Sequence, residues 1–183
     1  MTEIVAVSGP ELVTYADELA ALLLETVEAG ASVGFLAPLD RETAAAWWRE
    51  RAASVDAGHH QVWIARDGEQ VYGTVGLVRP ALPNARHRAE IAKLMVRPSA
   101  RGHGIGRALL SAVEQSAADE GLSLLVLDTE TGSPAERLYR AAGWTEYGSI
   151  PGYAGDTTGE LKPTTFFYKK VGPGQVLRVR ASQ

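Results

Sequence analysis

A glycine-rich turn between an extended run and a helical pattern constrains the fold of this chain more than any other feature. The turn occupies residues 101–106 and has the sequence Arg-Gly-His-Gly-Ile-Gly. The residues at 89–96 predict a strand before it, and apolar residues at three- and four-residue steps from 105 to 117 predict a helix after it. The nearly continuous apolar run at 122–128 then predicts a strand that is covered on both faces. These segments together predict a central strand–helix–strand unit.

The residues alone leave two interpretations of this turn open. Glycines let a backbone approach a ligand closely, and the free N–H groups and positive dipole end of a helix start favour a bound pyrophosphate. The alternative is a turn that only tightens the packing between strand and helix. A dinucleotide fingerprint needs Gly-x-Gly-x-x-Gly and a P-loop needs Gly-Lys-Ser/Thr, and the turn contains neither. What remains is the pattern Arg-x-x-Gly-x-Gly.

The other segments predict a mixed α/β domain in which antiparallel hairpins flank the central unit. Asp67-Gly68 is a hairpin turn signal, and Ser133 with Glu136 forms a predicted capping box at a helix start. No linker or internal repeat divides the sequence, so we expect a single domain over residues 1–183. The further predicted elements are strands at 4–7, 60–66, 70–79, 144–148 and 163–171, helices at 10–29, 40–57 and 134–142, a loop at 151–162, and a tail or edge strand at 172–183.

The composition argues against several classes of function. Lys and Arg number 18 and Asp and Glu number 22, and this acidic balance predicts no nucleic-acid partner, because such proteins usually present a basic face. The absence of cysteine removes disulfides, thiolate zinc sites and cysteine nucleophiles, and we expect no metal. The apolar run at 19–24 is far shorter than the roughly 20 residues of a membrane span, and no secretory signal is visible. We therefore expect a cytoplasmic protein with no membrane partner.

Two segments resemble signatures of a known family. The pattern at 101–106, with Leu-Met-Val at 94–96 before it, resembles the acetyl-CoA-binding motif of the GNAT superfamily of N-acetyltransferases. Residues 135–144, Ala-Glu-Arg-Leu-Tyr-Arg-Ala-Ala-Gly-Trp, resemble that family's second signature, a helix that bears a tyrosine and ends in Gly-aromatic. The core motifs thus span about 89–144. The resemblance implies a GNAT-type α/β fold, with a mixed, mostly antiparallel sheet and a central βαβ acetyl-CoA-binding unit flanked by helices.

Within that superfamily, short stretches look most like the tabtoxin resistance acetyltransferases. This resemblance implies transfer of an acetyl group to the amine of a small molecule, such as an antibiotic or toxin. One alternative is a protein or peptide N-acetyltransferase, which needs an open groove. Another is a non-catalytic acyl-CoA-binding regulatory module, which would lack an acid and a base. The stretches lie at 88–91, 93–96, 98–102, 127–130 and 151–153.

The resemblance also implies a division of labour around acetyl-CoA, the acetyl donor. Strand backbone groups would hold the pantetheine arm, and amides of the turn would hold the pyrophosphate. The acceptor amine would lie against splayed strands, and the loop at Tyr153 with the first two helices would form its lid. The implied cofactor-binding residues are Leu94, Met95, Val96, Arg101, Gly102, His103, Gly104, Ile105, Gly106 and Arg107.

Tyr139 is a candidate general acid. It occupies the tyrosine position of the second signature, where its hydroxyl would protonate the thiolate of coenzyme A. Its structural alternative is an ordinary core aromatic residue.

Glu90 and Asp128 are candidate carboxylates for taking the proton of the acceptor amine. Glu90 shares a predicted strand face with Ala92, Leu94 and Val96, and partial burial on such a face would raise its pKa towards that of a working base. Asp128 ends an apolar strand, where α/β proteins gather polar site residues. The structural alternative for each is a surface charge or a cap.

Several other residues receive weaker predictions. The adjacent histidines 59 and 60 have no metal spacing, so we expect them to be exposed, as we do for His103. Of Trp47 and Trp48, one can pack inward while the other reaches the substrate lid. The aromatic final strand can pair between subunits in a homodimer.

Overall fold

The computed structural model describes residues 2–172 and places one seven-stranded sheet at its centre. The expectation for residues 172–183 falls almost entirely outside the described residues. The strands are β1 (Glu3–Val7), β2 (His60–Asp67), β3 (Gln70–Val78), β4 (Arg88–Val96), β5 (Leu124–Glu130), β6 (Thr145–Gly155) and β7 (Leu161–Lys170). The helices are α1 (Gly9–Thr14), α2 (Ala16–Glu28), α3 (Arg41–Arg49), α4 (Ala52–Asp56), α5 (Ile105–Asp119) and α6 (Pro134–Ala141), with 3₁₀ turns at Pro83–Ala85 and Pro98–Ala100.

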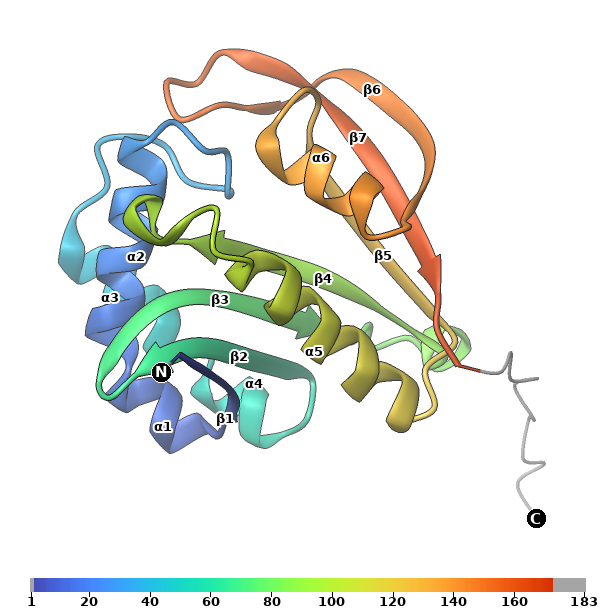
Figure 1. Ribbon diagram of the computed structural model, residues 1–183, viewed down its shortest axis with the longest axis horizontal. Helices are drawn as coiled ribbons and strands as arrows, with labels where there is room; N and C mark the ends of the chain where they lie inside the picture. The colour runs from blue at the N-terminus through green and yellow to red at the C-terminus, as the bar shows by residue number, and fades with distance from the viewer. Residues whose placement is uncertain (1, 173–183) are drawn as a thin grey trace.

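The sheet confirms the predicted fold class. Its strand order is β1-β2-β3-β4-β5-β7-β6, in which β4 and β5 are parallel and the other neighbours are antiparallel. The parallel pair is joined by α5, so β4–α5–β5 is the predicted central βαβ unit. In Figure 1, α5 lies across β3 and β4, and α1–α4 gather around the N-terminal half of the sheet.

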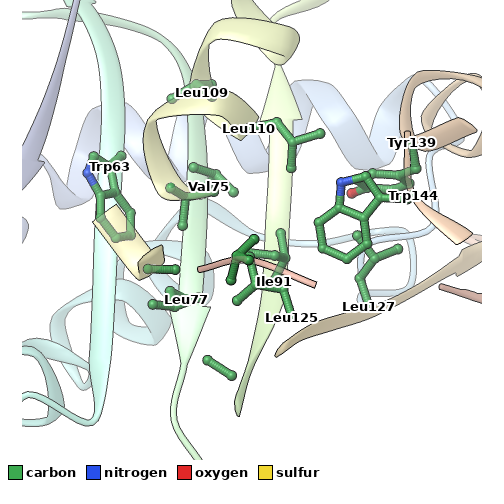
Figure 2. Packing of buried hydrophobic residues seen from close by; sticks show 14 of the residues in the cluster. Trp63, Val75, Leu77, Ile91, Leu109, Leu110, Leu125, Leu127, Tyr139 and Trp144 are labelled. Carbon is green, nitrogen blue, oxygen red and sulfur yellow. The ribbon is translucent and has the colours of Figure 1, made fainter. Parts of the chain in front are cut away.

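Each face of the sheet carries its own hydrophobic core. On one face, α5 residues such as Leu109 and Leu110 pack against Ile91 and Leu125. Figure 2 shows this cluster continuing to Tyr139 and Trp144 at the C-terminal half. On the other face, α2 and α3 pack against β2, β3 and β4, in a cluster that holds the fully buried Trp48. The sheet is therefore sandwiched between helices, and its central strands are fixed from both sides.

A β-bulge interrupts β4 in its middle. Ala92 is paired with Gly76 and Met95 with Thr74, so the two residues Lys93 and Leu94 oppose a single residue of β3. Lys93 has a φ of 54°, in the left-handed region that side-chain-bearing residues rarely adopt. Because an extra residue in one strand shifts its alternation, side chains beyond the bulge change faces.

The two cores record this change of face. Ala89 and Ile91, before the bulge, belong to the core under α5, whereas Met95, after it, belongs to the core under α2 and α3. Leu94 and Val96 pack against the α5 side instead. The regular alternation expected from the sequence, which grouped Glu90 with Leu94, is therefore wrong beyond Ala92.

The parallel strands separate soon after they meet. β4 and β5 pair only where Arg88, Ala89 and Glu90 lie beside Leu124, Leu125 and Val126. β5 stays paired with β7 up to Glu130, so its second half belongs to the β5–β7–β6 part of the sheet. In Figure 1, β4 and β5 accordingly diverge from their meeting point.

Helix and strand boundaries differ from the sequence-based expectation in three places. The predicted helices at 10–29 and 40–57 are each two helices, α1 with α2 and α3 with α4. Apolar residues keep their helical spacing through both breaks, so the periodicity of the sequence does not reveal that each predicted helix is interrupted. Similarly, β6 runs on through the predicted loop at 151–155, because its pairing with β7 resumes at Ala154 after an irregular stretch.

The predicted capping box at α6 is only half formed. Ser133 Oγ accepts a hydrogen bond from the Glu136 backbone N–H at 3.1 Å, as expected. The Glu136 carboxylate, however, accepts from the backbone N–H of Gly132 at 2.6 Å, one residue before the cap. The chain has a complete capping box at α1, where Ser8 and Glu11 satisfy each other's backbone N–H groups.

No helix among residues 2–172 combines the length and the apolar character needed to cross a membrane.

His60 is buried, which corrects the expectation that both adjacent histidines are exposed. It is 7% exposed and lies on β2. Burial, followed by the positive charges of Arg51 and Lys93, lowers the pKa of His60 to about 4. Its sequence neighbours gave no sign of this because strand pairing with Val78, and not local composition, carries His60 into the interior.

The buried histidine predicts a loss of stability on mild acidification. Between pH 6.5 and about 4 the unfolded chain binds a proton at this residue and the folded chain does not, so stability falls as the pH drops through that window. The slope contributed is up to about 1.4 kcal/mol per pH unit. In urea unfolding at several pH values, His60→Gln should show a shallower loss of stability than the wild type, whereas the exposed-site control His59→Gln should match the wild type. Equal slopes in all three proteins would contradict the assignment.

Candidate active site

A cavity of about 910 Å³ occupies the gap between the diverging strands. It extends from the glycine-rich turn, along the second half of β4, to the end of β5 and the start of α6. The sequence-predicted residues that line it are Glu90, Leu94, Met95, Val96, Arg101, Gly102, Gly104, Ile105, Gly106, Arg107, Asp128 and Tyr139. The fold therefore brings most of the predicted site residues to one cavity.

The glycine-rich turn has the geometry of an anion cradle. Gly102 and Gly104 have φ values of 82° and 80°, and a Cβ at either position would meet no atom within 4 Å. Gly104 is the N-cap of α5 and provides no side-chain cap, so the first-turn N–H groups of this 15-residue helix are not satisfied by a capping side chain. Open backbone donors at the positive end of a helix dipole fit a phosphate group.

Gly106 has a different role from the other two glycines. A Cβ there would lie 3.3 Å from Leu138 Cδ2 and 3.5 Å from Val96 Cγ2, so glycine permits α5 to approach α6 and β4 closely. The two interpretations of the turn therefore apply to different residues. Gly106 tightens packing, and the open space at Gly102 and Gly104 is compatible with a ligand, whose binding there stays a prediction.

The charged residues of the turn are on its surface. Arg101 and Arg107 are exposed, and their guanidinium groups donate to the backbone carbonyls of Val96 and Ala141 at 3.2 and 3.4 Å. His103 is exposed, as expected, and its side chain is outside the cavity lining, with Nδ1 3.4 Å from the Ala100 carbonyl. Its assignment as a cofactor-binding residue stays a prediction.

The second half of β4 offers an unpaired strand edge to the cavity. Beyond Glu90 its side towards β5 has no ladder partner, and residues Leu94, Met95 and Val96 line the opening. Met95 directs its side chain into the core, at 2% exposure, so its contribution to the cavity wall is largely backbone. An extended chain can hydrogen-bond to such an edge as a further strand would.

Glu90 and Asp128 enter the cavity from the two diverging strands. Glu90 pairs with Val126, and Asp128 lies two residues further along β5, so the side-chain alternation puts both carboxylates on the same face. Burial raises the pKa of both groups, and the charge of Asp128 raises that of Glu90 further. Lys93 opposes this rise at both. Both carboxyl groups thus bind a proton more readily than an ordinary surface carboxylate does.

Lys93 lines the same cavity, and sequence analysis gave it no role. The bulge turns its half-buried side chain towards α3, where Nζ lies 5.8 Å from the ring centre of Phe35 and 5.4 Å from that of Trp47. Burial and Arg51 lower the pKa of Lys93, and Asp128 and Glu90 raise it. No sequence signal announces this position, because it depends on the bulge.

Tyr139 is both a core residue and a cavity residue. It is 5% exposed, and its ring centre lies 5.9 Å from that of Trp144 and 6.1 Å from that of Phe167. Burial, with a smaller contribution from Asp128, raises the pKa of its hydroxyl above the ordinary value. The two interpretations of Tyr139 are thus compatible, since its packed ring fixes where the hydroxyl lies.

A polar clamp holds the aromatic support of Tyr139 in place. Glu114 of α5 accepts a hydrogen bond from Trp144 Nε1 at 2.8 Å and forms an ion pair with Lys169 of β7 at 2.6 Å. Lys169 also donates to the carbonyl of Ala142 at the end of α6. The clamp ties α5, α6 and β7 together behind the cavity.

The cavity is bridged by the loop that follows α2. Ser32 Oγ donates to the Gly155 carbonyl at 3.3 Å, and the Ala37 N–H donates to the Thr157 carbonyl at 2.8 Å. Residues 29–34 and 154–155 line the cavity on either side of this bridge. We call residues 29–37, with 154–157, the bridge.

The bridge replaces part of the predicted lid. Tyr153 is outside the cavity lining and packs edge-on against Phe166 at 5.0 Å, because residue 153 belongs to β6 and not to a loop. Trp48 packs inward at 1% exposure, as one of the adjacent tryptophans was expected to do, and Trp47 contacts Lys93 and Phe35.

Comparison with known proteins agrees with this geometry. A family model described as "Acetyltransferase (GNAT) family" matches residues 20–144. N-acetyltransferase 8B of Rattus norvegicus is 40% identical over 88 residues, which are 47% of this chain and 40% of that protein. The chain thus matches less than half the length of this relative.

Solved structures share the fold. A phosphinothricin acetyltransferase of the GNAT superfamily from Sinorhizobium meliloti, solved in complex with AcCoA, matches with a TM-score of 0.76 at 20% identity, over 93% of this chain and 89% of that one. A ribosomal-protein-alanine N-acetyltransferase from Brucella melitensis matches with a TM-score of 0.71 at 24% identity, over 92% and 99%. With a family model that covers most of the chain and a cavity at the expected place, this protein belongs to the GNAT family of acetyltransferases.

Proposed function

We propose that this protein transfers the acetyl group of acetyl-CoA to the amine of a small molecule. The observation that carries the proposal is a single cavity that joins an uncapped helix N-terminus, an open strand edge, two carboxylates and a tyrosine hydroxyl. These are an anion site, an extended-chain site, a base and an acid, in one continuous space. A non-catalytic acyl-CoA-binding module would have no need of the last two.

The residues present fit acetyl-CoA. The backbone N–H groups from Gly102 to Arg107 hold the pyrophosphate, with no Cβ at Gly102 or Gly104 to obstruct it. The open edge of β4 at 94–96 hydrogen-bonds to the amide-bearing pantetheine arm. Acetyl-CoA bound in this way supplies a thioester to the region between Glu90, Asp128 and Tyr139.

The carboxylates and the tyrosine then divide the proton transfers between them. Glu90, directly or through a water, takes the proton of the ammonium group, and the free amine attacks the thioester carbonyl. Strand N–H groups at 94–96 stabilise the negative charge on its oxygen. As the carbon–nitrogen bond forms and the carbon–sulfur bond breaks, Tyr139 gives its proton to the thiolate, and the second proton that leaves the nitrogen restores the tyrosine hydroxyl through water. Its raised pKa keeps the hydroxyl protonated until then.

The bridge supports a small acceptor over a protein segment. Hydrogen bonds from Ser32 and Ala37 connect the two walls of the cavity, at a place where an extended acceptor chain would need an open path. The resemblance of the stretches 88–91, 93–96, 98–102, 127–130 and 151–153 to tabtoxin resistance acetyltransferases supports an antibiotic or toxin as that small molecule.

The function is tested by release of coenzyme A thiol from acetyl-CoA in the presence of acceptors. A panel of small amines and a panel of peptides with free amino termini are compared at equal concentration. We expect turnover with members of the first panel and little with the second. Turnover confined to peptides would overturn the small-molecule assignment.

The cradle predicts that a carboxylate at its centre blocks the donor. Gly104→Asp places a negative charge where the pyrophosphate binds, and its side chain can accept from the free N–H groups of α5. We expect acetyl-CoA to bind at least about tenfold more weakly by calorimetric titration, which is about 1.4 kcal/mol. Gly68→Asp is the matched control, since Gly68 has a φ of 60° and open space around it but lies in the β2–β3 turn. Equal affinity in the two variants would disprove the cradle.

Removal of one oxygen atom tests the general acid. Tyr139→Phe keeps the ring contacts with Trp144 and Phe167, so the protein should fold and bind acetyl-CoA as the wild type does. We expect kcat to fall by roughly 10²–10⁴. Tyr147→Phe removes the hydroxyl of an exposed tyrosine and serves as the control. A Tyr139→Phe enzyme with unchanged kcat would leave the tyrosine a purely structural residue.

The carboxylate pair predicts a specific change in the pH profile. The rate should rise with pH through the apparent pKa of the base, because the base must be ionised. Asp128→Asn removes a charge that raises the pKa of Glu90, so the rise should shift to lower pH. Glu90→Gln should reduce kcat/KM by roughly 10²–10⁴.

The two carboxylate substitutions should also be non-additive if they act as a unit. The control is Glu42→Gln, in the exposed first turn of α3. An unshifted profile in Asp128→Asn would show that the two groups do not interact.

A further inference from the structure

We propose that the acceptor is a zwitterion of the amino acid type, and that Lys93 binds its anionic group while Glu90 and Asp128 receive its amine. This inference rests on the proposed N-acetyltransferase function and adds the chemical class of the substrate. It makes Lys93 a specificity-determining residue of the acceptor site.

The β4 bulge puts Lys93 on the same face as Glu90. Residues three apart in a regular strand point to opposite faces. Here the extra residue and the φ of 54° at Lys93 break the alternation, and both side chains line the cavity. The acidic and basic groups therefore approach the acceptor space from one strand, three residues apart.

The three charges in this space are not paired with other polar groups of the described residues, although Lys93 faces two aromatic rings. Among the described residues, no hydrogen bond or ion pair is formed by the side chains of Lys93, Glu90 or Asp128. They are close enough to shift one another's pKa, yet not in contact. Glu90 and Asp128 are exposed and Lys93 is half-buried, so a ligand that carries both an ammonium group and an anion can reach these charges and pair with them.

The surroundings of Lys93 keep its ammonium group at one place. Phe35 and Trp47 present their rings at 5.8 and 5.4 Å from Nζ, and these rings contact each other edge-on at 5.5 Å. Arg51 lies over the Trp47 ring and adds a second cation to this region, whereas the carboxylates of Glu90 and Asp128 are the acidic groups that act on Lys93.

The arrangement matches the two ends of a small zwitterion. Lys93, Glu90 and Asp128 all line the cavity, so a molecule with an amine and an anion is oriented when it enters. The amine then meets the proposed base, and the anion meets Lys93. A peptide amino terminus has its carboxyl group in an amide bond and offers Lys93 no such anion.

The left-handed backbone at Lys93 provides the means to test this without unfolding the protein. Lys93→Met keeps the length of the side chain and removes its charge. Lys93→Gly removes the side chain and also the backbone strain, because glycine adopts positive φ freely, so this variant is expected to fold. Either variant leaves the glycine-rich turn and Tyr139 untouched, and acetyl-CoA binding should persist in both.

The experiment measures kcat/KM by thiol release for matched acceptors. The panel contains the protein amino acids, the amide of each amino acid, and the aminophosphonate analogues. We expect the wild type to prefer amino acids or aminophosphonates over the amides by at least about tenfold, since two charged groups are recognised. Comparing the amino acids with their aminophosphonate analogues shows whether the anionic group of the substrate is a carboxylate or a phosphonate. Because Lys93 also lowers the pKa of Glu90, each enzyme is compared at a pH above the apparent pKa of its base. There the preference should disappear in both Lys93 variants, with a loss of at least about tenfold for the acids and little change for the amides.

Each remaining outcome has a defined meaning. Three outcomes would overturn this proposal and still leave N-acetyl transfer to other amines standing. They are equal losses for acids and amides in the Lys93 variants, a wild type that prefers the amides, and a wild type that binds acetyl-CoA but acetylates no zwitterion. Failure of the wild type to bind acetyl-CoA would instead overturn the proposed function itself.

Discussion

β4 and β5 pair over three residues and then separate, and the cavity with its site depends on that separation. Parallel strands that stayed paired would fill the space now open between them. The bulge on the other edge of β4 acts at the same level of the strand, where it shifts the register against β3 and changes the faces of the residues that follow. One short segment, residues 90–96, thus provides a carboxylate, a lysine and an open backbone edge.

The surrounding structure holds the separated halves at a fixed distance. On one side, α5 packs against β3 and β4 and presents its N-terminus to the cavity. On the other, Glu114 connects α5 to Trp144 and Lys169, which support α6 and β7. The bridge joins the two walls across the opening. Because these links are between packed elements, the positions of Tyr139 and the carboxylates relative to the cradle are set before any ligand binds.

Charge inside the cavity is distributed in a way that suits transfer to an amine. The cradle offers backbone N–H donors to a phosphate, while the acceptor end holds carboxylates whose pKa values are raised by burial. Tyr139 of α6 lines the same cavity, and its raised pKa keeps its hydroxyl protonated. In the proposed reaction, this arrangement would provide an acid and a base at the same pH.

Much of this followed from local sequence patterns. The glycine turn, the strands and helix around it, and the tyrosine-bearing helix each depend on residues close together in the chain, so their composition predicts them. The family resemblance also implied that Glu90 and Asp128 share one site, and both line the same cavity. Three features did not follow: the burial of His60, the bridge from residues 29–37, and the place of Lys93.

Each of these three depends on contacts between distant segments. His60 is buried by strand pairing with Val78, and the bridge rests on hydrogen bonds to residues more than 100 positions away. Lys93 reaches the cavity because β4 has one extra residue where it pairs with β3, and this bulge changes the direction of the side chain. The sequence by itself determined which groups could bind and react. The tertiary structure decided which of them share one cavity, because strand register and packing, and not residue type, set the direction of each side chain.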